Sequence, residues 1–178
     1  MGYTTDFHGR IKVTPPMSAA EVKYINAFND SRRMDREAGP YFVGGSDGEG
    51  IFNDRGQGHD SDVRNYNSPD ASQPSLWCGR CASDEGEYIE WDGGEKFYES
   101  AEWMQYIIDH FLGANPIAKT ANSKWLAEHL QGHTCNGVIE AQGEEPDDQW
   151  TLVVQNNKVS VVEAGGTLPA TEEIKLIK

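Results

Sequence analysis

The 178-residue chain has few cysteines, no long apolar run and few basic residues, and each shortage excludes a class of protein. Its 3 cysteines are too few for a disulfide framework, and a chain of this length can bury a core without one. No stretch approaches the roughly 18 apolar residues that a membrane helix requires, and the start, "MGYTTDF", lacks the pattern of a secretory signal. We therefore expect a cytoplasmic protein that has no contact with a membrane.

Basic charge is scarce as well: 15 Lys and Arg stand against 29 Asp and Glu, and the formal net charge is −14. Proteins hold the phosphate backbone of nucleic acids with clustered Lys and Arg, so we expect no direct contact with nucleic acid. An acidic surface keeps a protein soluble, and it also suits a protein partner that has a basic groove.

Hydrophobic periodicity predicts two main helices and several strands. Ser18 and Glu21 have the spacing of a capping box at the start of the first helix. Gly113 ends the second helix, whose apolar stripe runs from Trp103 to Phe111. The strands are expected at 3–13, 76–83, 87–94, 136–143, 149–155 and 158–162, the main helices at 17–34 and around 103–111, and a short helix within 122–132.

The order of these elements predicts an α+β fold. Strand, helix, strand, strand, helix, strand is the order of a ferredoxin-like (split βαβ) core, and two extra C-terminal strands follow it. We expect an antiparallel sheet with the two main helices on one face, and tight turns at Glu85-Gly86 and Asn156-Asn157. Residues 1–164 are expected to form a single domain with a long glycine-rich loop at 38–75, followed by a flexible tail at 165–178.

The stretch "WCGRC" resembles the WCGPC active site of thioredoxins, in which a helix start activates the first cysteine. Here a turn and a strand follow the motif, and residues i and i+3 of a strand lie about 10 Å apart on opposite faces, too far for a disulfide. We therefore expect one of Cys78 and Cys81 in the core and the other on the outer face. A zinc site of these two with His133 and Cys135 is the metal alternative, but we predict no metal and no cofactor.

Motifs of catalysis are missing too. The sequence has no G-x-S-x-G, no P-loop and no dinucleotide motif after a predicted strand, and we assign no catalytic residue. An enzyme that uses the cysteines or acidic loop residues such as Asp62 stays an open hypothesis.

The segment "SRRMDR" is the one compact basic patch of the chain. Its arginines fall near the predicted end of the first helix, where cations complement the helix dipole, and they also have the chemistry of a clamp for phosphate or carboxylate. Tryptophans on the predicted hairpin can stack on a base. The predicted ligand-binding residues are Arg32, Arg33, Arg36, Trp77, Trp91, Thr5, His8 and Lys96.

Several segments carry a resemblance to known proteins: "MGYTTDF", "SRRM", "LWC", "EWDGGEKFY" and "NGVIEAQGEEPDD". Together they resemble a widespread family of small uncharacterised bacteriophage and prophage proteins, over residues 1–161. The resemblance implies a phage accessory protein that acts by binding in the cytoplasm of the host cell.

Two binding hypotheses follow. The first is a non-enzymatic pocket protein for a small anionic, nucleotide-like ligand such as a host immune signal. The alternative is an acidic protein-protein inhibitor, or nucleic-acid mimic, of a host defence or replication protein. The expected partner is thus a small anionic ligand or a host protein, and homo-oligomer formation stays open.

Overall fold

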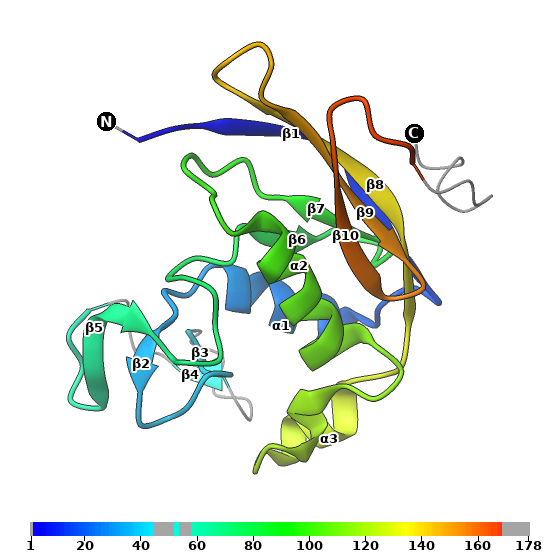
Figure 1. Ribbon diagram of the computed structural model, residues 1–178. Helices are drawn as coiled ribbons and strands as arrows, with labels where there is room; N and C mark the ends of the chain where they lie inside the picture. The colour runs from blue at the N-terminus through cyan, green and yellow to red at the C-terminus, as the bar shows by residue number, and fades with distance from the viewer. Residues whose placement is uncertain (1, 45–51, 54–57, 169–178) are drawn as a thin grey trace.

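The computed structural model describes residues 2–44, 52–53 and 58–168, and within them the chain folds as α+β (Figure 1). The strands are β1 (Thr5–Thr14), β2 (Met34–Arg36), β3 (Val43–Gly44), β4 (Phe52–Asn53), β5 (Val63–Pro69), β6 (Arg80–Ala82), β7 (Tyr88–Trp91), β8 (Thr134–Gly143), β9 (Gln149–Gln155) and β10 (Lys158–Glu163). The helices are α1 (Ala19–Asn29), α2 (Ser100–Ile107), which continues as a π-helical turn over Ile108–Leu112, and α3 (Lys124–His129), which follows a 3-10 turn at Ile117–Thr120. Within this described part, no helix is long and apolar enough to cross a membrane.

The main sheet has six strands in the order β10-β9-β8-β1-β7-β6, and every neighbouring pair is antiparallel. Strand β1 pairs with β8 along its whole length, from Thr5 opposite Gly143 to Thr14 opposite Thr134. Two small sheets, β2-β5 and the parallel pair β3-β4, lie at the end of the molecule away from β9 and β10 (Figure 1). An α+β fold with a mostly antiparallel sheet was predicted, and it is confirmed.

One face of the main sheet carries the core. Side chains alternate between the two faces of a strand, so Phe7, Ile11 and Val13 share a face, and all three are buried. They belong to the same hydrophobic cluster as residues of both long helices, among them Phe28 of α1 and Trp103 of α2. This cluster joins the helices to the sheet.

Helix α1 begins as predicted and ends earlier. The amide of Glu21 donates to Ser18 Oγ (3.2 Å) and the amide of Ser18 donates to Glu21 Oε1 (3.0 Å), which is the predicted capping box. The helix ends at Asn29 rather than near residue 34, because the hydroxyl of Ser31 donates to the carbonyl of Ala27 (2.7 Å) and offers the backbone an alternative to the next helical turn.

Both predicted turns are present. Gly86 has a φ of +74°, and a side chain there would meet the carbonyl oxygen of Met17 at 2.3 Å, so only glycine fits without strain. Asn156 and Asn157 have φ values of +48° and +70° and join β9 to β10. Positive φ at two successive residues is what a type I′ hairpin turn requires.

The segment at 38–75 is less irregular than expected, because it contains β5. This strand pairs with β2 through two register shifts, which remove the regular alternation that would have revealed it in the sequence. Residues 45–51 and 54–57 of the predicted loop, and 169–178 of the predicted tail, lie outside the described residues. At the start of that tail, Leu168 packs against Val138 and Val153 on the outer face of the sheet.

Candidate functional site

The three arginines of the predicted clamp have partners inside the protein. Arg32 donates from Nε to the carbonyl of Tyr66 (3.2 Å), and its guanidinium lies over the ring of that tyrosine. Arg33 is buried and donates to the carbonyls of Ser31, Pro40 and Phe42. These contacts hold the residues around β2, and they leave Arg33 turned away from solvent.

Arg36 is buried as well, and it lies between two carboxylates. Its Nη1 is 3.3 Å from an oxygen of Asp60 and 3.3 Å from an oxygen of Asp62. The geometry therefore corrects the interpretation of "SRRMDR": the cluster ties β2 to the chain around β5 and does not form an open clamp beside the tryptophans. Sequence reasoning missed this because the partners of Arg36 lie more than twenty residues away.

The predicted tryptophans are placed differently from each other. Trp91 is partly buried against Phe7, with ring centroids 5.4 Å apart, and its indole N–H donates to the carbonyl of Gly94 (3.2 Å). Trp77 precedes β6 and is 46% exposed. Of these two tryptophans, Trp77 is thus the one whose ring is exposed for stacking on a ligand.

Trp77 borders a hollow of about 620 Å³ between residues 75–79 and 92–99, which we call the Trp77 pocket. Tyr98, 55% exposed, and Phe97 contribute further aromatic surface. Lys96, another predicted ligand-binding residue, also lines the pocket. The structure therefore brings Trp77 and Lys96 together, although they are 19 positions apart in the chain.

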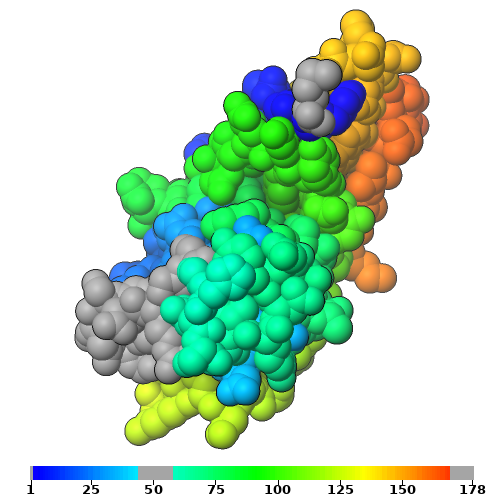
Figure 2. Space-filling view, turned by 90° about the vertical axis from the view of Figure 1, so that its left-hand side faces the viewer, coloured from blue at the N-terminus to red at the C-terminus, as the bar shows by residue number. Residues whose placement is uncertain are grey.

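The backbone around the Trp77 pocket is unusual at two places. Lys96 has a φ of +59°, a conformation that a residue with a side chain adopts at a cost of about 1–3 kcal/mol and that clusters at functional sites. Gly79 has a φ of +67°, and a side chain there would meet the ring of Phe97 at 2.8 Å. Gly2 lies against the side chains of Lys96 and Tyr98, and Figure 2 shows the blue N-terminal residues beside the green ones that precede α2.

Charges of both signs line the Trp77 pocket. Asp92, Glu95 and Glu99 supply carboxylates, and Lys96 supplies an ammonium group. Asp92 accepts hydrogen bonds from the side chain of Asn29 (3.0 Å) and from the amide of Gly94 (2.8 Å), which hold the pocket wall against α1. A ligand here meets acceptors for N–H groups and one cation.

Behind this wall lies Arg80, which sequence reasoning did not select. Its side chain is fully buried on the core face of β6, with the guanidinium carbon 5.0 Å from the ring centroid of Phe97 and 5.3 Å from that of Phe7. Nη2 donates to the hydroxyl of Ser100, at the first turn of α2. Burial lowers the pKa of Arg80 to about 10, so the guanidinium stays charged at neutral pH. The sequence did contain a signal for this burial. Arg80 is two positions from Cys78 and from Ala82, and side chains two positions apart in a strand share a face, so Arg80 lies on the same face as two small apolar residues.

The remaining predicted residues lie elsewhere. Thr5 is paired with Gly143 near one end of the main sheet. His8 is on the outer face, opposite Glu140, where it borders a separate hollow of about 550 Å³ formed with β9 and residues 162–168. The structure does not bring His8 to the Trp77 pocket.

The cysteines are all free thiols. Cys78 and Cys135 are buried, and burial raises the pKa of each to about 12. Cys81 is only half-buried, as expected for one core and one outer cysteine, and burial raises its pKa too. A thioredoxin-type site needs a lowered thiol pKa, which none of these has.

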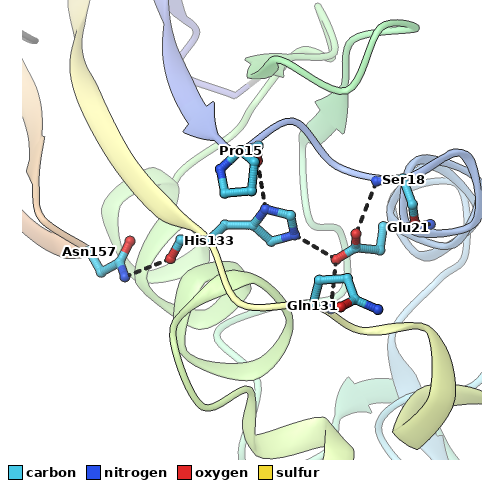
Figure 3. A network of polar contacts seen from close by, with 6 residues as sticks. All are labelled: Pro15, Ser18, Glu21, Gln131, His133 and Asn157. Atoms are coloured by element: carbon cyan, nitrogen blue, oxygen red, sulfur yellow. Dashed lines mark hydrogen bonds and ion pairs between the residues drawn. The ribbon is translucent and has the colours of Figure 1, made fainter.

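The zinc alternative also lacks its histidine. Both ring nitrogens of His133 are engaged, Nδ1 with the carbonyl of Pro15 (2.7 Å) and Nε2 with the carboxylate of Glu21 (2.8 Å) (Figure 3). Across the part of the chain that the structure describes, no three His, Cys, Asp or Glu side chains are grouped as a metal site would need.

Comparison with known proteins adds no assignment. No protein-family model matches the chain, and neither the curated proteins nor the solved structures include a significant match. The resemblance to phage proteins therefore stays a prediction.

Proposed function

We propose that the protein is a non-enzymatic binding protein and that its Trp77 pocket takes a small, planar, anionic ligand of the nucleotide type. The observation that carries this proposal is the pair of exposed aromatic residues, Trp77 and Tyr98, bordering one hollow together with the strained residue Lys96. Its volume of about 620 Å³ falls within the range of roughly 300–1,000 Å³ that small-molecule sites occupy.

The chemistry of the lining selects the ligand class. Stacking of a base on an aromatic side chain contributes about 1–3 kcal/mol, and every base has a ring face to offer. The carboxylates of Asp92, Glu95 and Glu99 accept hydrogen bonds from amino groups, whereas the ammonium group of Lys96 attracts an anion. A nucleotide with an amino-bearing base satisfies both, and a host nucleotide signal is the biological ligand that the resemblance to phage proteins favours.

We also propose that the main sheet contains a ferredoxin-like core. The strand order β8-β1-β7-β6 supports it, because α1 connects β1 to β6 across β7, and α2 connects β7 to β8 across β1. Each helix thus joins two strands that run in the same direction with one antiparallel strand between them, which is the split βαβ arrangement. Both helices contribute to one hydrophobic cluster, which supports their placement on a single face.

The test is to measure the affinities of AMP, GMP, CMP and UMP for the intact chain by calorimetry. We expect the three nucleotides with an exocyclic amino group to bind more tightly than UMP. W77A should weaken AMP binding about 5- to 150-fold, because it removes the stacking surface, and W77F should retain part of the affinity. I117A removes an equally exposed apolar side chain outside the pocket and is the matched control. Equal affinities for wild type and W77A, or no binding of any nucleotide, would overturn the proposal.

The alternative of an acidic inhibitor or nucleic-acid mimic rests on net charge and stays a prediction. Along the outer face of β1, Asp6 is followed by His8, Arg10 and Lys12. This row contains side chains of both charge signs, whereas a mimic of nucleic acid would have a row of carboxylates on such a face. The row therefore favours the hypothesis of a ligand pocket over that of a nucleic-acid mimic.

A further inference from the structure

Three described arginines have buried side chains, and Arg80 differs from the other two in its partners. Arg33 donates to three carbonyl oxygens, and Arg36 lies between two carboxylates. Arg80 has one hydroxyl, that of Ser100, and its Nε and Nη1 have no hydrogen-bond partner among the described residues. The carboxylate of Asp92 acts on this charge from a distance, but no carboxylate in the described part of the chain contacts the guanidinium. Buried N–H groups without hydrogen bonds are costly, so those of Arg80 call for a partner.

The position of Arg80 indicates where that partner comes from. The preceding residue, Gly79, lines the Trp77 pocket, and so does Phe97, whose ring lies beside the guanidinium. Ser100, which accepts the hydrogen bond of Arg80, follows Glu99, another lining residue. The guanidinium is therefore directly behind the pocket wall, and Phe97 is the ring that both sides share.

We infer that Arg80 is the anchor for the anionic group of the ligand, which reaches the guanidinium when the ring of Phe97 turns aside. This inference rests on the proposed function and adds the chemistry of the anchor: an oxyanion, phosphate or carboxylate, that accepts from the two N–H groups now without partners. Guanidinium binds such groups through parallel hydrogen bonds. The first turn of α2, beside Ser100, adds a partial positive charge on the same side.

The segment that holds Phe97 would carry this motion, which takes the ring away from Phe7. Gly93 and Lys96 have φ values of +83° and +59°, so the segment contains one glycine hinge and one strained residue. A side chain added at Gly93 would meet nothing within 4 Å. Turning Phe97 would also release its close contact with Gly79.

The first experiment uses the wild-type chain and follows the Nε–H signal of Arg80 by ¹H–¹⁵N NMR. AMP should move this signal, whereas adenosine, which lacks the phosphate, should bind at the pocket without moving it. Inorganic phosphate that moves the Arg80 signal while adenosine fails to bind would support the anchor and overturn the proposed function. An Arg80 signal that stays in place while AMP binds would overturn the anchor and leave the pocket intact; an internal water would then be the partner of the guanidinium.

The second experiment compares affinities for AMP and adenosine by calorimetry. In wild type, AMP should bind at least 10-fold more tightly than adenosine, and in R80Q most of this preference should be lost, with only the attraction of Lys96 left and the adenosine affinity unchanged. R64Q changes an exposed arginine paired with Asp35 and should keep the wild-type ratio. If K96Q abolishes the preference and R80Q does not, Lys96 is the anchor and the inference is wrong. Should R80Q fail to fold, the NMR experiment on wild type decides alone.

Discussion

Nε2 of His133 lies 2.8 Å from Oε2 of Glu21, and this contact joins the residue before β8 to the first turn of α1 (Figure 3). Nδ1 of the same ring faces the carbonyl oxygen of Pro15 at 2.7 Å. A carbonyl only accepts, so Nδ1 carries a hydrogen, and the carboxylate of Glu21 takes the second hydrogen bond from Nε2. Below its raised pKa, His133 is thus an imidazolium that forms a buried ion pair with Glu21.

The pair predicts how stability depends on pH. Burial is the largest single effect on each group and opposes both charges, but the hydrogen bonds and the mutual attraction together exceed it. The His133 ring and the amides of Ser18 and Gln131 lower the pKa of Glu21, and the carboxylate of Glu21 and the carbonyl of Pro15 raise the pKa of His133. The contribution of His133 is complete below its unfolded pKa, about 6.5, and is lost as pH rises through its folded pKa. That of Glu21 is complete above its unfolded pKa, about 4.3, and is lost as pH falls through its folded pKa.

E21Q tests this dependence. Glutamine preserves the capping geometry and removes the charge, so we expect a loss of about 1–3 kcal/mol in the free energy of unfolding at pH 5.5, and a smaller loss at high pH. Urea unfolding at pH 4, 5.5, 7 and 8.5 measures both. E128Q, which breaks the exposed pair of Glu128 with Lys124, should change stability by less than about 1 kcal/mol. A loss in E21Q that is the same at every pH would contradict the ion pair.

The side chain of Asn157 predicts a second effect. Its carbonyl oxygen accepts from the amide of Cys135 (2.7 Å), and its NH₂ donates to the carbonyl of His133 (3.1 Å). N157G keeps the positive φ but leaves the Cys135 amide and the His133 carbonyl without this partner, so we expect a loss of about 1–3 kcal/mol in unfolding free energy. N156G makes the same change one residue earlier, and it should be nearly neutral. Thermal unfolding of both variants that shows equal losses would refute a role for the Asn157 side chain.

Local features of this fold could be predicted from the sequence, and contacts between distant residues could not. The capping box of Ser18 and Glu21 and the turn at Asn156-Asn157 depend on neighbouring residues only, and both are present. The bond from Glu21 to His133 spans 112 residues, and no periodicity encodes it. The same limit explains the candidate site.

In the sequence, the arginines of "SRRMDR" are conspicuous because they are adjacent, yet their partners come from the segments that fold over β2. Arg80 is inconspicuous in the sequence because it stands alone, although its strand position directs it into the core. Trp77 and Lys96 were selected for their chemistry, and only the path of the chain between β6 and α2 brings them to one hollow. The adjacent arginines thus indicated where positive charge is concentrated in the sequence. The folded chain, however, places Arg80 and not these arginines behind the Trp77 pocket.

Alanine substitutions at two glycines with similar backbone conformations distinguish the cost of backbone strain from that of a steric clash. Gly86 and Gly93 have φ values of +74° and +83°, so an alanine pays a similar conformational cost at both. Only at Gly86 would the added carbon meet a backbone oxygen, that of Met17, at 2.3 Å. G86A should therefore lower the unfolding free energy by about 1–3 kcal/mol more than G93A does. Chemical denaturation of both variants measures the difference, and equal stabilities would contradict the close packing of this turn on the segment before α1.

The thiols predict a graded reaction with iodoacetamide. Alkylation requires the thiolate, and the half-buried Cys81, whose pKa burial raises, should react slowly at pH 7 and faster as pH increases. Cys78 and Cys135 are fully buried with a pKa of about 12, so they should react only when the chain unfolds. Intact-mass spectrometry of the folded chain should find one adduct, lost in C81S, and three after denaturation in urea. Rapid reaction of both Cys78 and Cys81 at neutral pH would mean that the two thiols share a low-pKa site, and the comparison of "WCGRC" with a redox motif would then hold after all.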